Sequence, residues 1–286
     1  MATDVIFDNQ FVTDFLHRIR DEVVSRIVKA TVPFYAIQDD KIKRDRSGVL
    51  LRVGDELFIL TASHDLRSIV NHQIHLYVGW DQEEKVPWPI VDSTFNTSEE
   101  EIRDIAVVKL SKEAARKLSA TYEPISMREV QRHPDRSDAF FIVCGYPQEW
   151  LEVAKDHIDS RPLPYLARLY KRGVPPMDQF NFDPSVHFLI DFSKNAVTLG
   201  TKQKAGDWPS RDGMKGISGC GVWRIVGHSQ DEMNKWRPDD IALAGIQHRV
   251  WYTDECAAAT RINYAMHFLE ESYPEIGPAL RIVYPK

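Results

Sequence analysis

The stretch Leu57-Phe58-Ile59-Leu60-Thr61-Ala62-Ser63-His64 decides the fold. Its apolar run is short and rich in aromatic and branched residues, which is typical of a buried β-strand. The turn former Gly54-Asp55 precedes it, and another apolar run, residues 49–53, lies before that turn. Two such runs joined by a glycine turn predict a β-hairpin. The second strand of this hairpin ends at His64.

Runs of the same kind recur along the chain between turn formers. We predict strands at residues 32–37, 49–53, 57–62, 74–78 and 105–110, and then at residues 139–145, 165–170, 186–192, 221–226 and 241–247. Short strands at this spacing indicate an antiparallel barrel or sandwich rather than alternating strands and helices.

Helical periodicity occurs at both ends of the chain. Residues 11–29 carry apolar side chains every four residues, which predicts an amphipathic helix. This helix either packs on its own domain or serves as a docking or pro-segment. Residues 257–271 predict a closing helix that stops at Tyr273-Pro274. Residues 147–185 are a long Pro- and charge-rich stretch that includes the predicted strand 165–170, and residues 228–240 are expected to be a long hairpin loop. Long loops of this kind often bind partners or substrates.

The composition limits the function classes. The 286 residues include 43% hydrophobic residues, and the formal net charge is -6. An acidic balance gives no electrostatic reason to expect a nucleic-acid or membrane partner. No apolar run reaches the roughly 18 residues that span a bilayer, and no secretory signal is visible at the N-terminus. The odd, widely spaced Cys144, Cys220 and Cys256 indicate a reducing compartment, so we expect a cytoplasmic protein.

Two further motifs supply reactive groups that complement His64. Asp104 opens the run Asp-Ile-Ala-Val-Val-Lys-Leu, and Ser218 lies within Gly216-Ile217-Ser218-Gly219. A serine hydroxyl needs a neighbouring base to become a nucleophile, and histidine is the natural base near neutral pH. A buried aspartate fixes the histidine tautomer, and a glycine two residues before the serine allows backbone N–H groups to face an oxyanion.

These three segments resemble those of trypsin-like serine proteases. Leu-Thr-Ala-Ser-His is similar to the family's Leu-Thr-Ala-Ala-His, and Asp-Ile-Ala-Val-Val-Lys-Leu is similar to Asp-Ile-Ala-Leu-Leu-x-Leu. Gly-Ile-Ser-Gly is similar to Gly-Asp-Ser-Gly, and the order along the chain agrees. The resemblance extends from about residue 31 to residue 272 and is to small intracellular peptidases of bacterial type.

The resemblance implies a mainly β fold of two antiparallel six-stranded β-barrels. We expect an N-terminal helix in residues 1–30, one barrel in residues 31–122, a second in 123–250, and a C-terminal helix and tail in 251–286. It also implies that His64 is the general base, that Asp104 orients it, and that Ser218 is the nucleophile. The N–H groups of Gly216 and Ser218 would form the oxyanion hole. No cofactor and no metal is implied.

The chain departs from the family's pattern beside the serine. Ile217 replaces the Asp that pairs with a newly cut N-terminus, so activation by such a cut is not expected. Cys220-Gly221 replaces the usual Gly-Pro, so the oxyanion loop must be shaped by other contacts. Cys220 itself is interpreted as a small buried thiol and not as a nucleophile.

Substrate recognition leaves alternatives open. Asp212 lies six residues before Ser218, the spacing at which the trypsin-like family carries an aspartate, so the resemblance implies cleavage after Lys or Arg if Asp212 lines the pocket. Alternatively, Asp212-Gly213 is only a turn. Gln247 or His248 could touch the substrate side chain, and Arg249 could obstruct the pocket or neutralise Asp212. His72 and His75 are too few for a metal site.

The sequence therefore predicts a serine endopeptidase that cuts a protein substrate through an acyl-enzyme, with a possible regulatory partner such as a sensor protein. The alternative within the same fold is a catalytically silent scaffold or binding module. An α/β-hydrolase is disfavoured because that class needs Gly-x-Ser-x-Gly and the chain order Ser, Asp, His.

Overall fold

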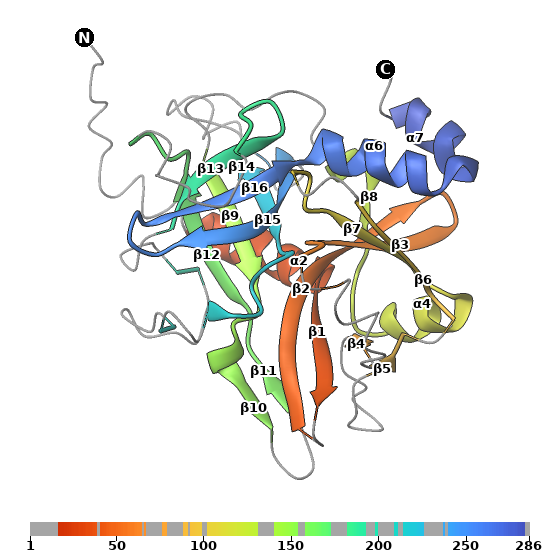
Figure 1. Cartoon of the computed structure of the whole chain (residues 1–286), viewed down its shortest axis with the longest axis horizontal. Coiled ribbons are helices and arrows are strands. Elements are labelled where there is room, and N and C mark those ends of the chain that lie inside the picture. Colours follow the sequence, from red (N-terminus) through yellow and green to blue (C-terminus); the bar gives the residue numbers. More distant parts are fainter. Residues whose placement is uncertain are drawn as a thin grey trace.

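Two curled β-sheets build the protein, with helices at both chain ends (Figure 1). The structure is a computed structural model. It describes residues 17–38, 41–64, 66, 76–78, 88–90, 92–98, 102–130, 140–153, 158–172, 182–192, 198–199, 209–210, 214–225, 237 and 240–283.

The first sheet is formed by the N-terminal half of the chain. Its strands are β1 (Thr31–Gln38), β2 (Lys41–Val53), β3 (Glu56–Thr61), β4 (Leu76–Val78), β5 (Trp88–Pro89), β6 (Thr94–Thr97), β7 (Ala106–Lys109) and β8 (Ile125–Ser126). The order is β5-β4-β1-β2-β3-β7-β6, and β8 pairs in parallel with β2. Without β5 and β8, which have two residues each, six antiparallel strands remain. The turn between β2 and β3 contains Gly54 at φ 58°, which confirms the predicted hairpin.

The second sheet contains six strands of the described chain. They are β9 (Phe140–Gly145), β12 (Leu163–Arg168), β13 (His187–Asp191), β14 (Gly221–Ile225), β15 (Ala242–Trp251) and β16 (Cys256–Arg261). Their order is β12-β9-β14-β15-β16-β13, and every pairing is antiparallel. The predicted fold class, two antiparallel six-stranded barrels with helices at the two ends, is therefore confirmed.

Two predictions about the elements need correction. The predicted helix 257–271 begins only at α6 (Ile262–Ser272), because residues 257–259 lie in β16 and pair with β13 and β15. Alanine favours helices, but burial between two strands outweighs this preference. The stretch 147–185, in which a strand was predicted only at residues 165–170, contains that strand as β12 and also the separate hairpin of β10 (Leu151–Val153) and β11 (Ile158–Ser160), which lies beside β2 (Figure 1).

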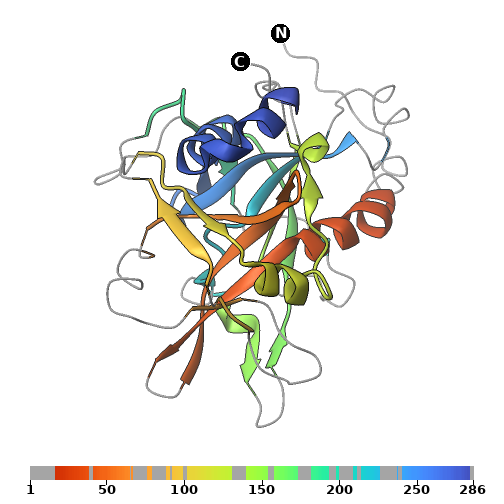
Figure 2. The same cartoon turned by 90° about the vertical axis from the view of Figure 1, so that its right-hand side faces the viewer.

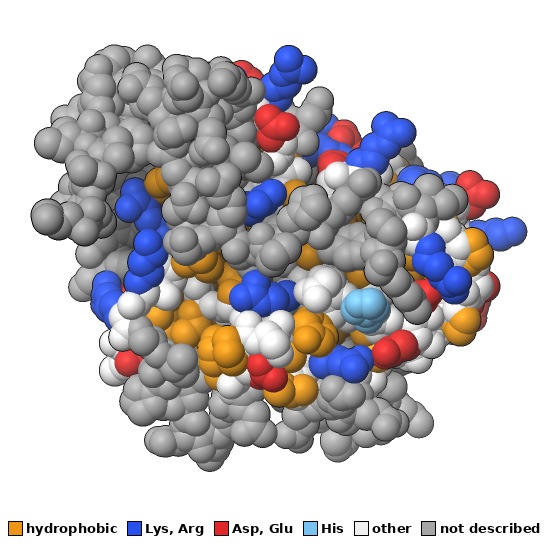
Figure 3. All heavy atoms as spheres, turned by 90° about the horizontal axis from the view of Figure 1, so that it is seen from above, with side chains coloured by type: hydrophobic (Ala, Val, Ile, Leu, Met, Phe, Trp, Pro, Cys, Tyr) orange, Lys and Arg blue, Asp and Glu red, His pale blue; other side chains and the backbone are white. Residues whose placement is uncertain are grey.

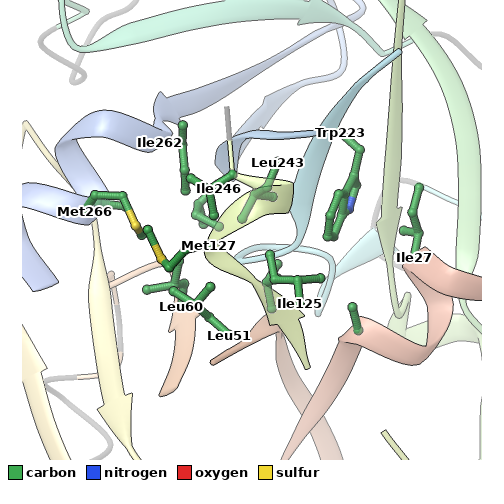
Figure 4. Close-up of a cluster of buried hydrophobic side chains, with 14 of the residues drawn as sticks. Ile27, Leu51, Leu60, Ile125, Met127, Trp223, Leu243, Ile246, Ile262 and Met266 are labelled. Carbon is green, nitrogen blue, oxygen red and sulfur yellow. The ribbon is translucent and has the colours of Figure 1, made fainter. Parts of the chain in front are cut away.

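The largest hydrophobic cluster lies between the two sheets (Figure 4). The helical segments η1 (Ile19–Val24) and α2 (Ser25–Ala30) insert buried residues into it, including Ile27. Leu51 and Leu60 come from the first sheet, and Trp223 and Leu243 come from the second. The described part of the N-terminal helix therefore packs on its own chain; residues 11–16 of the predicted helix lie outside the described residues.

The C-terminal helices connect the second sheet back to the first (Figure 2). Helix α6 follows β16, and α7 (Gly277–Val283) continues from it. At the end of α6 the Tyr273 hydroxyl lies 3.0 Å from the Thr94 hydroxyl on β6, and Lys109 on β7 forms an ion pair with Glu275 at 2.9 Å. A shorter helix, α4 (Lys112–Leu118), follows β7.

No helix in the described ranges is long and apolar enough to cross a bilayer. On the face seen in Figure 3, basic and acidic side chains of the described residues are interspersed rather than gathered by sign.

Candidate active site

Asp104 and His64 meet where two paired strands end. His64 follows β3, and Asp104 lies just before β7, the neighbour of β3 in the sheet. The His64 Nδ1 atom lies 2.8 Å from Asp104 Oδ2, and the His64 backbone N–H donates to Asp104 Oδ1 at 2.8 Å. Ser63 also donates to Oδ1, from its N–H at 2.9 Å and its hydroxyl at 3.0 Å. The carboxylate thus fixes both the ring of His64 and the backbone that carries it.

Asp104 is held as a buried anion. Its backbone has φ 41°, a left-handed conformation that aspartate tolerates better than most residues, and the residue is 5% exposed. Burial alone would raise the pKa of this carboxyl, but hydrogen bonds from His248 and His64 bring the pKa below its ordinary value. A charged carboxylate beside Nδ1 keeps the His64 proton there, which leaves Nε2 on the other side of the ring as an acceptor.

Two further histidines cover the inner side of Asp104. His248 on β15 is fully buried, and its Nδ1 lies 3.3 Å from Asp104 Oδ2. Behind it, the ring centroid of His187 lies 5.3 Å from that of His248, and His187 Nε2 lies 2.5 Å from the Ile102 carbonyl oxygen. Burial lowers the pKa of His248, and it lowers the pKa of His187 to about 4. Both rings are therefore neutral near pH 7.

Ser218 lies in the loop that leads into β14. Its hydroxyl donates to the His248 carbonyl at 3.4 Å, which is at the weak end of hydrogen-bond lengths. His248 thus contacts Ser218 through its backbone and Asp104 through its ring. The Ser218 carbonyl accepts from the Ser47 N–H at 2.8 Å, which attaches the loop to the first sheet. Among the hydrogen bonds of the described residues, none joins the Ser218 hydroxyl to the His64 ring.

The glycines beside Ser218 are required by the backbone. Gly216 has φ 90° and Gly219 has φ 88°, values that other residues rarely adopt. A side chain at position 219 would overlap the Thr61 hydroxyl and the Ser47 carbonyl. The N–H groups of Gly216 and Ser218 donate to no other residue that the structure describes. Within the described ranges, two backbone donors at the serine loop are therefore left without an acceptor.

Of the residues predicted to contact substrate, the structure describes Gln247 and His248, and both are buried. Asp212, like His72 and His75, lies outside the described residues. Gln247 is fully buried, and its amide donates to the Arg249 carbonyl at 3.2 Å. His248 is 2% exposed and faces Asp104.

Cys220 is fully buried, and burial raises the pKa of its thiol well above the ordinary value. This surrounding agrees with the small buried thiol that we inferred from the sequence.

Sequence reasoning missed Arg46 and Ser47 on β2. Arg46 is 3% exposed, and its Nη1 donates to the carbonyls of Ala62 at 2.8 Å and His64 at 3.0 Å. Ser47 contacts the loop around Ser218. A lone arginine or serine in a strand-forming run carries no sequence signal for such contacts, because both are usually exposed.

No group of three or more His, Cys, Asp or Glu side chains that could hold a metal ion occurs within the described residues.

Comparisons with known proteins were made for sequence and for structure. No protein-family model matches the chain, and no curated protein matches it in sequence. In structure it is similar to the scabies mite inactivated protease paralogue, with 15% identity and a TM-score of 0.47, over 89% of this chain and 98% of that one. It is also similar to the Rv3671c protease of M. tuberculosis.

The active form of Rv3671c shares 13% identity with a TM-score of 0.44, over 86% of this chain and 81% of that one. An inactive serine-to-alanine mutant gives 13% and 0.45, over 89% and 92%. These similarities are to structures of the trypsin-like type that the motifs led us to expect. At such TM-scores they add nothing to what the strands and the site show directly.

Proposed function

We propose that the protein is a serine endopeptidase in which Ser218 is the nucleophile, His64 the general base and Asp104 the residue that orients the histidine and stabilises the imidazolium that forms. The observation that carries the proposal is the convergence of three segments that are remote in the chain. His64 Nδ1 lies 2.8 Å from Asp104 Oδ2, and His248 contacts both Asp104 and the Ser218 hydroxyl.

In the proposed reaction, His64 Nε2 takes the proton of the Ser218 hydroxyl as Oγ attacks the substrate carbonyl. The imidazolium that forms is stabilised by the Asp104 carboxylate. Collapse of the tetrahedral intermediate breaks the C–N bond, and His64 returns the proton to the departing amine. Water then repeats the sequence on the acyl-enzyme and releases the acid and the free serine.

The developing oxyanion would be bound by the N–H groups of Gly216 and Ser218. Their lack of partners among the described residues supports this role, since donors that are already aimed need no rearrangement during the reaction. His64 is about one-third exposed, so substrate has access to its ring.

The Ser218 hydroxyl must leave the His248 carbonyl and turn towards His64. A 3.4 Å hydrogen bond opposes that rotation weakly. Catalytic hydrogen bonds are often long before substrate binds and tighten in the complex.

The proposal also includes a substrate class and a cellular compartment. A protein or peptide substrate follows from the reaction, and a preference for Lys or Arg rests on Asp212 alone. The three cysteines are free and buried, which supports action in the cytoplasm. We further propose regulation by a protein partner, with the helical pattern of residues 11–29 and the stretch 147–185 as the candidate segments.

A catalytically silent scaffold is the second candidate. It is favoured by one observation: the Ser218 hydroxyl is bonded to His248 rather than to His64. In that reading the buried Asp104 and His248 stabilise the fold only.

A fluorophosphonate probe separates the two candidates. The endopeptidase should be labelled on Ser218, as located by mass spectrometry, and Ser218→Ala should remove the label. Ser185→Ala, which alters an exposed hydroxyl in another turn, is the matched control and should label like the unaltered protein. A folded protein that stays unlabelled would favour the scaffold.

A further inference from the structure

The loop that carries Ser218 lacks the two devices that shape it in the family it resembles. Ile217 replaces the aspartate that receives a cut N-terminus, and Cys220-Gly221 replaces Gly-Pro. Ile217 is 2% exposed and packs in the apolar cluster of the second sheet. Gly145 at the end of β9 permits this packing, because a side chain there would approach Ile217 Cγ1 within 2.6 Å.

Every carbonyl from Met214 to Ser218 accepts a hydrogen bond. The donors are Ile217 N–H to Met214 at 3.3 Å, Gln148 N–H to Lys215 at 2.6 Å, Ser47 Oγ to Gly216 at 2.8 Å, Cys220 N–H to Ile217 at 3.2 Å, and Ser47 N–H to Ser218 at 2.8 Å. The orientation of each peptide plane in the loop is therefore determined.

These hydrogen-bonded carbonyls determine the direction of the two proposed oxyanion donors, the N–H groups of Gly216 and Ser218. In a trans peptide the C=O and the following N–H point in opposite directions. The Lys215 carbonyl turned towards Gln148 directs the Gly216 N–H away from it, and the Ile217 carbonyl turned towards Cys220 does the same for the Ser218 N–H. Rotation of either plane would put a carbonyl where the oxyanion has to bind.

Ser47 connects this loop to the rest of the site. Its hydroxyl donates to the Gly216 carbonyl and accepts from the Tyr146 N–H at 2.9 Å. Its carbonyl accepts from the Thr61 hydroxyl at 2.7 Å, on the strand that leads to His64. Ser47 is fully buried, so water cannot replace these partners. Ser47, a residue of the first sheet, thus forms hydrogen bonds to the residue that follows β9 of the second sheet, to the loop that carries Ser218 and to strand β3, which leads to His64.

A second tie comes from the segment after β9. The Glu149 carboxylate accepts from both the N–H and the hydroxyl of Ser210, at 2.7 and 2.5 Å. Gln148, its neighbour, holds the Lys215 carbonyl. Ser210 and Lys215 are therefore both attached to the same short segment, which starts at Tyr146.

We infer that Ser47, assisted by the Tyr146–Glu149 segment, is a positioning residue for the oxyanion loop. It keeps the N–H groups of Gly216 and Ser218 directed towards the place where the oxyanion binds, and this requires no cleavage of the N-terminus. This inference rests on the proposed function. It adds that this loop keeps its shape without a newly formed N-terminus, and that control of the peptidase acts by some means other than forming this loop.

The test uses p-nitrophenyl acetate, a small ester that needs no specific side-chain pocket, with the Ser218→Ala rate subtracted. Ser47→Ala should lower kcat about tenfold to a hundredfold with little change in KM, since misplacing an oxyanion donor costs less than the roughly hundred- to thousandfold loss from deleting one. Thr31→Val is the matched control, because it removes another buried hydroxyl bonded to a carbonyl, Ile27, at 2.7 Å. It should lower the melting temperature yet keep kcat within about twofold.

Glu149→Ala decides the matter if Ser47→Ala does not fold, because Glu149 is exposed and its loss leaves the core intact. It should lower kcat severalfold. Full rates in both Ser47→Ala and Glu149→Ala would overturn the inference while leaving the proposed function standing. Failure of the unaltered, folded protein to react with fluorophosphonate at Ser218 would overturn the proposed function itself.

Discussion

Replacing His248 tests whether the inner histidine supports Asp104. The useful pair is His248→Asn and His248→Leu. Asparagine and leucine have nearly the same shape, so both leave the same space, but only asparagine can place an N–H donor where Nδ1 was. The comparison between them therefore isolates one hydrogen bond to the carboxylate from the loss of ring packing.

The magnitude follows from the surroundings of Asp104. Hydrogen bonds to a charged group contribute about 1.5–3 kcal/mol, and the 3.3 Å contact between His248 Nδ1 and Asp104 Oδ2, which departs from ideal hydrogen-bond geometry, contributes no more than the lower end of that range. His248→Leu should therefore be about 1.5 kcal/mol less stable than His248→Asn at pH 7. Because the donor matters only while Asp104 is charged, and its pKa lies below the ordinary value, the gap should persist to about pH 4 and narrow below it.

Urea unfolding at a series of pH values measures this gap, and p-nitrophenyl acetate hydrolysis measures its effect on catalysis. Without the donor from residue 248, the Asp104 carboxylate is oriented less firmly towards the Nδ1–H of His64. The kcat of the leucine variant should therefore also fall, by about tenfold. Equal stability and equal rates in the two variants would refute the reasoning, since the donor would then contribute nothing.

Three other predictions follow from single contacts. Gly219→Ala should give no active, folded protein, because its φ of 88° and the overlap with Thr61 both oppose a side chain; native-like near-UV circular dichroism would contradict this. Burial lowers the pKa of His187 from 6.5 to about 4, so the unfolded chain takes up this proton first and stability should fall as the pH drops from about 6.5 to 4. His187→Asn should flatten that decline in urea titrations. Ile27→Ala should cost about 3 kcal/mol through a cavity in the core between the sheets, and an unchanged denaturation midpoint would show that the N-terminal helix is dispensable.

Local patterns in the sequence predicted most of the fold. The hairpin around Gly54 and strands such as β3 and β9 could be predicted because each strand is a short apolar run. Turn formers separate these runs along the chain. Residues 257–259 were misread, because three alanines look helical until their neighbours on β13 and β15 are known. Strand identity there depends on tertiary pairing, which no local pattern contains.

The candidate site likewise contains some residues that local motifs predicted and others that only the tertiary structure could identify. His64, Asp104 and Ser218 could be named because each lies in a short motif with chemical meaning. His248 could not be placed behind Asp104, nor Ser47 beneath the serine loop, since both contacts join segments far apart in the chain. They arise from how the two sheets pack, and each residue taken alone resembles an ordinary strand residue.

The cooperation of Ser218 and His64 is tested most directly by combining their substitutions. Esterase kcat/KM should be measured for Ser218→Ala, His64→Ala and the double variant. If the two groups act as one unit, each single variant should fall to about the rate of the double variant, because either loss removes the same reaction path. Losses that multiply, or a His64→Ala variant as fast as the unaltered protein, would contradict the account.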